Sequence, residues 1–165
     1  MHSLKARLAG VLDCFGAQRI LVLGDLMLDR YIYGRVRRIS QEAPVPVVAV
    51  SDEVEMPGGA SNVALNLRAL GAGAAVAGWV GSDAGGARLE ALLAAAGVDI
   101  SAVARLDGLR TTVKERIVAE HQQVVRVDWD AAPGPDAAAA AAWHAALARV
   151  AGTVTGAVIE DFGKG

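Results

Sequence analysis

The chain has 165 residues, of which 53% are hydrophobic, with a formal net charge of -2 and a mean hydropathy of +0.36. This length and composition predict one globular domain with a substantial core, and they exclude an intrinsically disordered chain. The small net charge gives no electrostatic basis for binding nucleic acid or an anionic membrane surface, so we expect neither as a partner.

Cysteine content and hydropathy bear on the compartment. Cys14 is the single cysteine, so no internal disulfide forms, which fits a reducing cytoplasm. Charged residues interrupt the apolar positions of residues 1–16, unlike a signal peptide. The longest uncharged window, residues 69–82, is shorter than the about 20 residues of a membrane span. We therefore expect a cytoplasmic protein without a membrane partner.

The first third of the chain predicts a helix, a buried strand and a small β flap. Apolar residues recur at helical spacing from Leu4 to Phe15, and Gly16 can end that helix. The uninterrupted apolar run 20–24 is typical of a strand buried on both faces of a parallel sheet. Residues 31–34 and 45–50 predict further strands. Pro44 and Pro46 place them at a sheet edge or in a separate small sheet, as a flap over a site.

The rest of the chain alternates between predicted helices and strands. Helices are expected at 60–70, 83–96 and 136–150, and strands at 74–80 and 154–159, with a hairpin formed by 111–118 and 124–128. Gly71 and Gly97 end the first two helices, and residues 131–135 read as a linker. This β-α rhythm predicts one α/β domain with a mostly parallel sheet flanked by helices.

Polar residues from three segments converge on one predicted sheet edge. Asp25 and Asp29 follow the first strand, and Asp161 follows the last. Gly58, Gly59 and Asn62 open a helix, where backbone N–H groups are free to bind a ligand. Ligands bind at the carboxyl ends of parallel strands, and this donor and acceptor set suits a polyhydroxylated ligand such as a sugar. The alternative is that the aspartates cap turns and Asn62 caps its helix.

Competing site motifs do not occur in the sequence. Gly24-Asp25-Leu26-Met27 after the first strand is not a dinucleotide fingerprint, and no Gly-x-x-x-x-Gly-Lys-Ser/Thr run is present. His121 and His144 have no partner at metal-ligand spacing, so we expect no metal site.

Several segments resemble the ribokinase/phosphofructokinase-B family of carbohydrate kinases, and within it the heptose-7-phosphate kinase domains of ADP-heptose biosynthesis. The resemblance covers nearly the whole chain. Its motifs are Gly24–Tyr31, Arg38–Val47, the Gly-Gly/Asn helix start, Thr112–Lys114 with Gln122–Asp128, and Asp161–Gly165. The Gly-Gly/Asn element indicates a sugar or nucleoside kinase, whereas Ser-Gln-Glu-Ala-Pro-Val-Pro-Val at 40–47 singles out the heptose branch.

The resemblance implies a ribokinase-like fold and a set of substrate-binding residues. Asp29, Gly58, Gly59 and Asn62 are expected to bind sugar hydroxyls, with Asp161 also at the substrate. Residues 31–50 are expected to form a β lid that also makes a homodimer interface. Lys114 and Arg126 become candidates for the sugar phosphate, because a dianion in a partly desolvated pocket needs charge-assisted donors. The alternative for both is an ordinary solvated strand face.

The resemblance also implies what this sequence lacks. In the family, ATP binding and the catalytic Asp of a Gly-Ala-Gly-Asp turn lie in the C-terminal half, and Gly71-Ala72-Gly73-Ala74 has alanine at that position. The full-length kinase is expected to use ATP and Mg²⁺. We expect neither to bind this chain alone, which reads as the N-terminal, sugar-binding part of one kinase domain. A complementing C-terminal half is a second expected partner.

Two other functions remain open at this point. One is a non-catalytic module that binds sugar phosphate or drives dimerisation. The other is an unrelated doubly wound nucleotide-binding domain, which would need nucleotide affinity that no motif here predicts.

Overall fold

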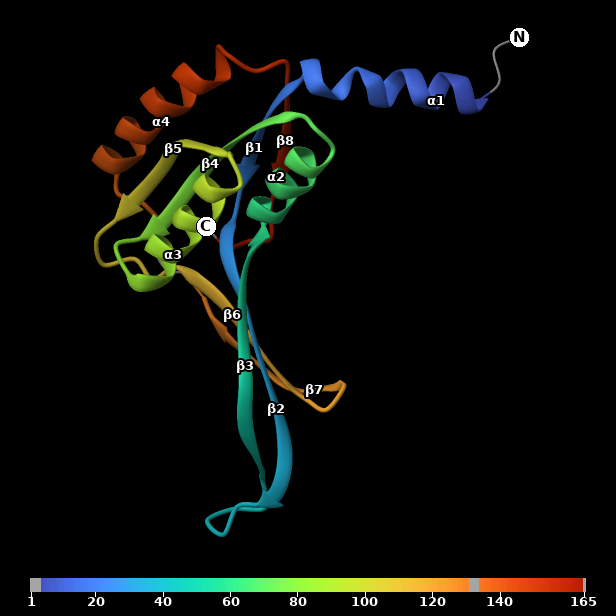
Figure 1. Cartoon of the computed structure of the whole chain (residues 1–165). Coiled ribbons are helices and arrows are strands. Elements are labelled where there is room, and N and C mark those ends of the chain that lie inside the picture. Colours follow the sequence, from blue (N-terminus) through green and yellow to red (C-terminus); the bar gives the residue numbers. More distant parts are fainter. Residues whose placement is uncertain (1–3, 131–133, 165) are drawn as a thin grey trace.

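The computed structural model describes residues 4–130 and 134–164 and shows a layered α/β body from which an extended sheet projects (Figure 1). In chain order the elements are α1 (Leu4–Asp13), the 3-10 turn η1 (Phe15–Ala17), β1 (Arg19–Gly24), β2 (Leu26–Ile39), β3 (Pro46–Gly59), α2 (Ala60–Ala69), β4 (Gly73–Gly81), α3 (Ala84–Ala95), β5 (Asp99–Leu106), β6 (Thr112–Ala119), β7 (Gln122–Trp129), α4 (Ala137–Ala151) and β8 (Gly156–Glu160). Most of the predicted linker, residues 131–133, lies outside the described residues.

The body is built on a four-stranded parallel sheet in the order β5-β4-β1-β8. Successive side chains of a strand point to opposite faces, so neighbouring residues of β1 enter different cores. Val22 packs in one core with Leu89 of α3, on the face that α2 and α3 cover. Leu21 packs in the other core with Val150 of α4. The predicted strand at 20–24 and the α/β fold class are thus confirmed.

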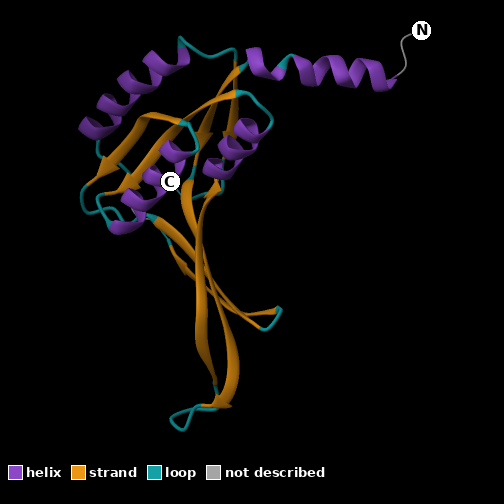
Figure 2. Ribbon diagram, in the orientation of Figure 1, coloured by secondary structure: helices purple, strands orange, loops and turns teal. Residues whose placement is uncertain are grey.

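The projecting sheet, which we call the lid sheet, has four strands in the order β3-β2-β6-β7. β2 pairs antiparallel with β3 and parallel with β6, and β6 pairs antiparallel with β7. Figure 2 shows these strands leaving the body together. Pro46 begins the edge strand β3, as its missing N–H predicts.

The lid sheet is larger than the sequence pattern predicted. The flap strands extend back to Leu26 and on to Gly59, and the hairpin at 111–128 belongs to the same sheet as the flap. Asp29 follows β1, as expected, but it lies within β2, whereas the sequence pattern predicted the next strand only from residue 31. The chain turns at Gly24 and enters β2 directly, and the parallel pairing of β2 with β6 joins segments far apart in sequence, which no local pattern contains.

Strand β5 was not predicted. Its sequence is rich in small residues and carries charges at Asp99 and Arg105, so the period-two signal is weak. Ala102 is nevertheless 1% exposed, because β4 pairs alongside it and Trp143 of α4 donates an indole N–H to its carbonyl at 2.9 Å. Burial by tertiary neighbours, rather than local propensity, makes this segment a strand.

The helix boundaries agree closely with the sequence signals. Asp83 accepts a hydrogen bond from the Gly86 N–H at 2.8 Å, and Asp136 accepts one from the Ala139 N–H at 2.8 Å. Both aspartates are therefore true N-caps. Gly71 (φ 89°) ends the helix predicted at 60–70 in a backbone conformation that favours glycine.

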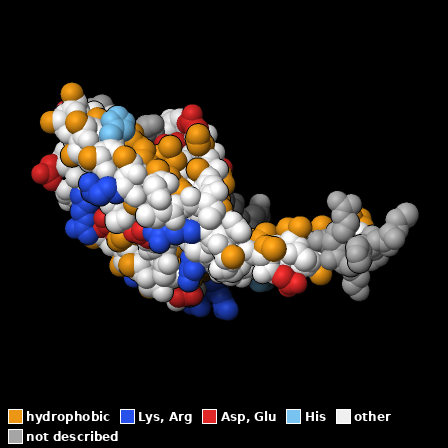
Figure 3. Space-filling model, turned by 90° about the horizontal axis from the view of Figure 1, so that it is seen from above, with side chains coloured by type: hydrophobic (Ala, Val, Ile, Leu, Met, Phe, Trp, Pro, Cys, Tyr) orange, Lys and Arg blue, Asp and Glu red, His pale blue; other side chains and the backbone are white. Residues whose placement is uncertain are grey.

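Two apolar surfaces are exposed to solvent, one on helix α1 and one at the edge of the parallel sheet. The predicted helix α1 forms, but its apolar stripe lies on a projecting arm, with Leu4 70% and Leu8 56% exposed (Figure 3). At the end of the parallel sheet, β8 is an edge strand, and its Ile159 is 73% exposed. Among the helices of the described residues, none has the length and hydropathy that crossing a membrane requires.

Candidate functional site

The Gly-Gly turn lies where β3 leaves the lid sheet and enters α2. A Cβ on Gly58 would lie 2.6 Å from Asp29 Oδ2, and a Cβ on Gly59 would lie 2.6 Å from the Asp25 carbonyl oxygen. Gly59 also has φ 54°, a region in which glycine is favoured. Two different close approaches therefore explain the glycine pair, and one of them places the Asp29 carboxylate directly against the turn.

Asp29 forms an ion pair with a cation on the neighbouring strand. Arg116 of β6 donates a hydrogen bond from a terminal guanidinium nitrogen to Asp29 Oδ1 at 2.6 Å, and both side chains are less than 20% exposed. The Arg116 guanidinium also lies over the Tyr31 ring, 5.1 Å from its centroid. Burial lowers the pKa of Arg116, but the hydrogen bond and charge of Asp29 outweigh it and raise the pKa above its ordinary value. The sequence pattern did not single out Arg116.

The two predicted phosphate ligands differ in their surroundings. Lys114 is the register partner of Asp29 on β6, and its Nζ lies 5.6 Å from the centre of the Phe162 ring. Arg126 on β7 is half exposed and forms two hydrogen bonds to Asp128, at 2.7 and 3.0 Å. Lys114 forms no salt bridge within the described part of the chain, so its charge is available to a ligand.

The predicted convergence of the first and last strands is present at Asp25. Its Oδ2 accepts hydrogen bonds from the backbone N–H groups of Phe162 at 2.7 Å and Lys164 at 3.0 Å. Asp161 is exposed and accepts a hydrogen bond from the Gly163 N–H at 2.7 Å. Asp25 therefore organises the loop after β8.

A cavity of about 210 Å³ opens at the carboxyl ends of β1, β4 and β8, the edge at which parallel sheets bind ligands. Two indoles contribute to its wall, Trp79 and Trp143, in an edge-to-face contact with centroids 5.3 Å apart. Its lining residues are Leu23, Gly24, Asp25, Leu26, Gly78, Trp79, Leu109, Arg110, Thr111, Thr112, Trp143, Ile159, Asp161 and Lys164.

The predicted site residues divide between this cavity and the lid sheet. Asp161 lines the cavity, whereas Asp29, Gly58 and Lys114 lie together where the lid sheet joins the body. The contact between Lys114 and Phe162 links the two parts. Asn62 lies in the first turn of α2, directly after the Gly-Gly turn, and is exposed.

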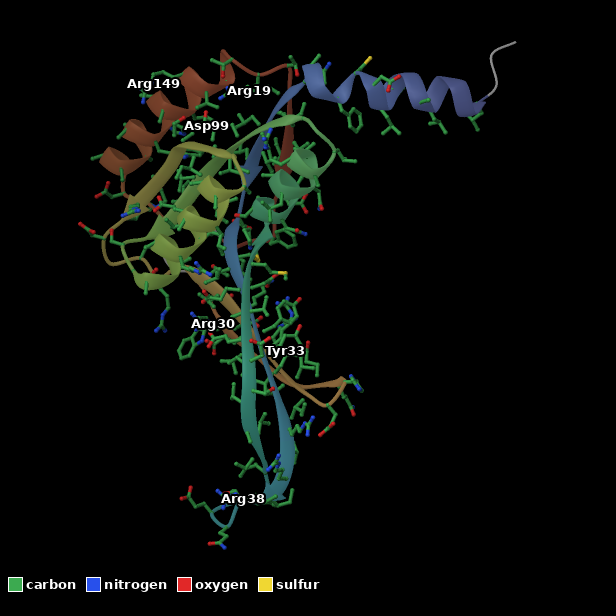
Figure 4. The ribbon with its side chains drawn as sticks, viewed as in Figure 1. Arg19, Arg30, Tyr33, Arg38, Asp99 and Arg149 are labelled. Atoms are coloured by element: carbon green, nitrogen blue, oxygen red, sulfur yellow. The ribbon has the colours of Figure 1, made fainter. Side chains whose placement is uncertain are left out.

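The opposite face of the lid sheet carries an ion-pair network that the sequence pattern did not reveal. Arg30 bonds Glu55 at 2.8 Å and Glu115 at 2.6 Å, and Arg88 of α3 bonds Glu55 at 2.7 Å. Burial raises the pKa of Glu55, but hydrogen bonds from Arg88 and Arg30 outweigh it, so the pKa lies below its ordinary value. Figure 4 shows Arg30 at the base of the lid sheet, where this network ties the sheet to α3.

Residues 4–130 and 134–164 contain no group of three or more His, Cys, Asp and Glu side chains arranged to hold a metal ion. They do contain the largely buried Asp29 carboxylate, the Gly58-Gly59 turn and Lys114, which forms no salt bridge among these residues. This set is suited to sugar hydroxyls and one anionic group.

The parallel sheet, the projecting lid and the Gly-Gly turn beside a carboxylate define a ribokinase-like α/β fold. A ribokinase of Arabidopsis thaliana, solved with ribose and ATP, is similar with a TM-score of 0.55 at 20% identity, over 70% of this chain and 36% of that chain. A carbohydrate kinase from Agrobacterium tumefaciens has a TM-score of 0.53 at 26% identity, over 68% of this chain and 35% of that chain.

The chain belongs to the pfkB family of carbohydrate kinases, whose family model matches residues 17–158. The bifunctional protein HldE of Azotobacter vinelandii is 45% identical over 154 residues, which cover 92% of this chain and 31% of that protein. HldE of Halorhodospira halophila is 49% identical over 149 residues, which cover 89% of this chain and 30% of that protein. The chain therefore spans about a third of the length of these relatives.

Proposed function

We propose that this chain is the sugar-phosphate-binding part of an ATP-dependent kinase that phosphorylates heptose 7-phosphate at its anomeric hydroxyl. The observation that carries the proposal is the Asp29 carboxylate, fixed against Gly58 and Arg116 with Lys114 beside it. A fixed carboxylate accepts hydrogen bonds from sugar hydroxyls. The first turn of α2 is proposed to supply backbone N–H donors beyond that of Ala60, which already bonds the Asp25 carbonyl at 3.1 Å. The heptose assignment rests on the 40–47 motif and on the HldE relatives.

In this proposal Lys114 is the main ligand for the sugar phosphate, and Arg126 is secondary. The Lys114 ammonium lies on the same strand row as Asp29, so one ligand can touch both residues. The Arg126 guanidinium already forms two hydrogen bonds to Asp128, which a phosphate would have to replace. Gly59 and Asn62 are proposed to bind hydroxyls at the start of α2, and Asp161 to bind the substrate from the cavity side.

Isothermal titration with D-glycero-D-manno-heptose 7-phosphate and with the unphosphorylated heptose tests this assignment. Asp29→Asn is expected to weaken the binding of both ligands, because it removes the charge from an acceptor of hydrogen bonds from sugar hydroxyls. Lys114→Met is expected to weaken only the phosphorylated ligand, by about 10- to 100-fold, the value of a charge-assisted hydrogen bond. Arg149→Gln removes an exposed charge on α4 and serves as the control. If the unmodified chain binds neither ligand, the proposed function is wrong.

We further propose that the chain alone does not transfer a phosphoryl group. Phosphoryl transfer needs both substrates positioned and the phosphate charge neutralised. The 165 residues contain no Gly-Ala-Gly-Asp turn, the motif that carries the catalytic Asp in the family. ATP and Mg²⁺ are therefore proposed to act only in the full-length enzyme, and no step is assigned to them here. ATP-dependent phosphorylation of heptose 7-phosphate by this chain would refute this part.

We also propose that the exposed edge strand β8 and the apolar outer part of the lid sheet bind protein partners. β8 is an edge strand with Ile159 exposed, which fits a complementing half that continues the parallel sheet. The outer part of the lid sheet exposes apolar side chains, including Val36, Ile39, Val45 and Val50, which fits a homodimer through the lid. Sedimentation velocity at several concentrations distinguishes a dimer from a monomer. Ile39→Lys with Val50→Lys is expected to dissociate a lid dimer.

A further inference from the structure

The Asp29 carboxylate is fixed from two sides. Gly58 leaves no room behind Asp29 Oδ2, since even a methyl group there would lie at 2.6 Å. Arg116 bonds Asp29 Oδ1 at 2.6 Å. Each oxygen therefore has a defined environment, and Oδ2 keeps lone pairs that are free of the guanidinium.

Arg116 is itself fixed by aromatic packing. Its guanidinium lies 5.1 Å from the Tyr31 ring centroid, and the Tyr31 and Tyr33 rings stack with centroids 6.2 Å apart and an interplanar angle of 13°. Figure 4 shows Tyr33 on the lid sheet, farther from the body than Arg30. Asp29, Tyr31 and Tyr33 alternate along β2 and so share one face of the sheet with Arg116, the register partner of Tyr31.

We propose that Arg116 is a positioning residue that holds the Asp29 carboxylate in its sugar-binding orientation, with Tyr31 fixing the guanidinium, and is not a ligand of the sugar phosphate. This inference rests on the proposed function and adds a specific role to one residue of that site.

The pairing decides between positioning and phosphate binding. With less than 20% of either side chain exposed, Arg116 and Asp29 form a partly desolvated ion pair. If Arg116 moved to a phosphate, the largely buried Asp29 carboxylate would lose its partner. Breaking such a pair costs more free energy than breaking a solvent-exposed one. Lys114, in the adjacent row of β6, provides a positive charge without that penalty.

The first test measures Asp29 itself in the unliganded protein. NMR couplings between Hα and Hβ of Asp29 report its χ1 rotamer, and a chain of 16.9 kDa is suitable for this measurement. Asp29 is expected to show one staggered rotamer in the unmodified chain and averaged couplings in Arg116→Gln. Arg116→Lys keeps the charge and is expected to restore part of the single-rotamer signature. Arg149→Gln is the control. A single unchanged rotamer in Arg116→Gln overturns the proposal.

The second test separates positioning from phosphate binding. Arg116→Gln is expected to weaken the binding of heptose 7-phosphate and of unphosphorylated heptose by the same factor. That factor is at most about 10- to 100-fold, the value of the charge-assisted hydrogen bond from the sugar that a misplaced Asp29 carboxylate no longer accepts. A loss confined to the phosphorylated ligand would show that Arg116 binds phosphate and overturn the proposal. If the unmodified chain binds no sugar, the proposed function fails, and the rotamer measurement still decides whether Arg116 holds Asp29.

Discussion

Asp83 offers the sharpest test of how the body supports the lid sheet. Its carboxylate accepts hydrogen bonds from the Gly86 N–H at 2.8 Å, the Thr111 N–H at 2.9 Å and the Thr111 hydroxyl at 2.7 Å. Thr111 is 1% exposed and immediately precedes β6, the strand that carries Lys114 and Arg116. One side chain thus caps α3 and anchors the start of a site strand.

The expected cost of Asp83→Ala follows from these contacts. Loss of the N-cap costs about 1 kcal/mol. The unpaired Thr111 groups, which are buried, cost about 1–3 kcal/mol more. The total is about 2–4 kcal/mol, and with a urea dependence of about 2 kcal/mol per M the midpoint falls by about 1–2 M. Asp83→Asn keeps one acceptor oxygen and a good cap residue, so about half of this loss is expected.

Urea titration followed by circular dichroism, repeated from pH 7 to pH 3, measures both the loss of unfolding free energy in Asp83→Ala and its pH dependence. Burial raises the pKa of Asp83, but the hydrogen bonds from Thr111 and Gly86 outweigh it and lower the pKa. A lowered folded-state pKa means that the stabilisation is complete above the unfolded value, about 3.9, and is lost as pH falls through the folded value. The difference in unfolding free energy between the unmodified chain and Asp83→Ala should therefore stay constant above about pH 5 and become smaller below about pH 4. A loss under about 0.5 kcal/mol at pH 7 would refute the reasoning.

Three further substitutions test other contacts. Gly58→Ala, whose Cβ would lie 2.6 Å from Asp29 Oδ2, should cost about 1–3 kcal/mol and weaken sugar binding in titration calorimetry, while Gly152→Ala, with no atom nearer than 3.6 Å, should do neither. Leu28→Ala, at 0% exposure, should cost about 2–5 kcal/mol in urea unfolding; a smaller loss would contradict the packing described. Glu55→Gln should cost about 1–2 kcal/mol at pH 7, and because the pKa of Glu55 is lowered, the difference should shrink below about pH 4.

The sequence alone determined the elements whose signals are local. The helices predicted at 83–96 and 136–150 begin at Asp83 and Asp136, which cap them in the structure. The buried run of β1 needs no partner to be recognised as a strand. The pfkB membership was also readable, because the motifs at 24–31 and 40–47 and the Gly-Gly/Asn helix start are contiguous. The substrate assignments remain predictions for all seven residues, namely Asp29, Gly58, Gly59, Asn62, Lys114, Arg126 and Asp161.

Only the tertiary structure decided how these pieces form a site. The pairing of β2 with β6 brings Arg116 onto Asp29, and the turn after β3 brings Gly58 against the same carboxylate. Neither contact has a local signature, because each joins segments distant along the chain, and their register is set by hydrogen bonding across strands. The sequence therefore specified the residue types of the candidate site, whereas the partner of each charged side chain, such as Arg116 for Asp29, was decided by the packing of the lid sheet on the body.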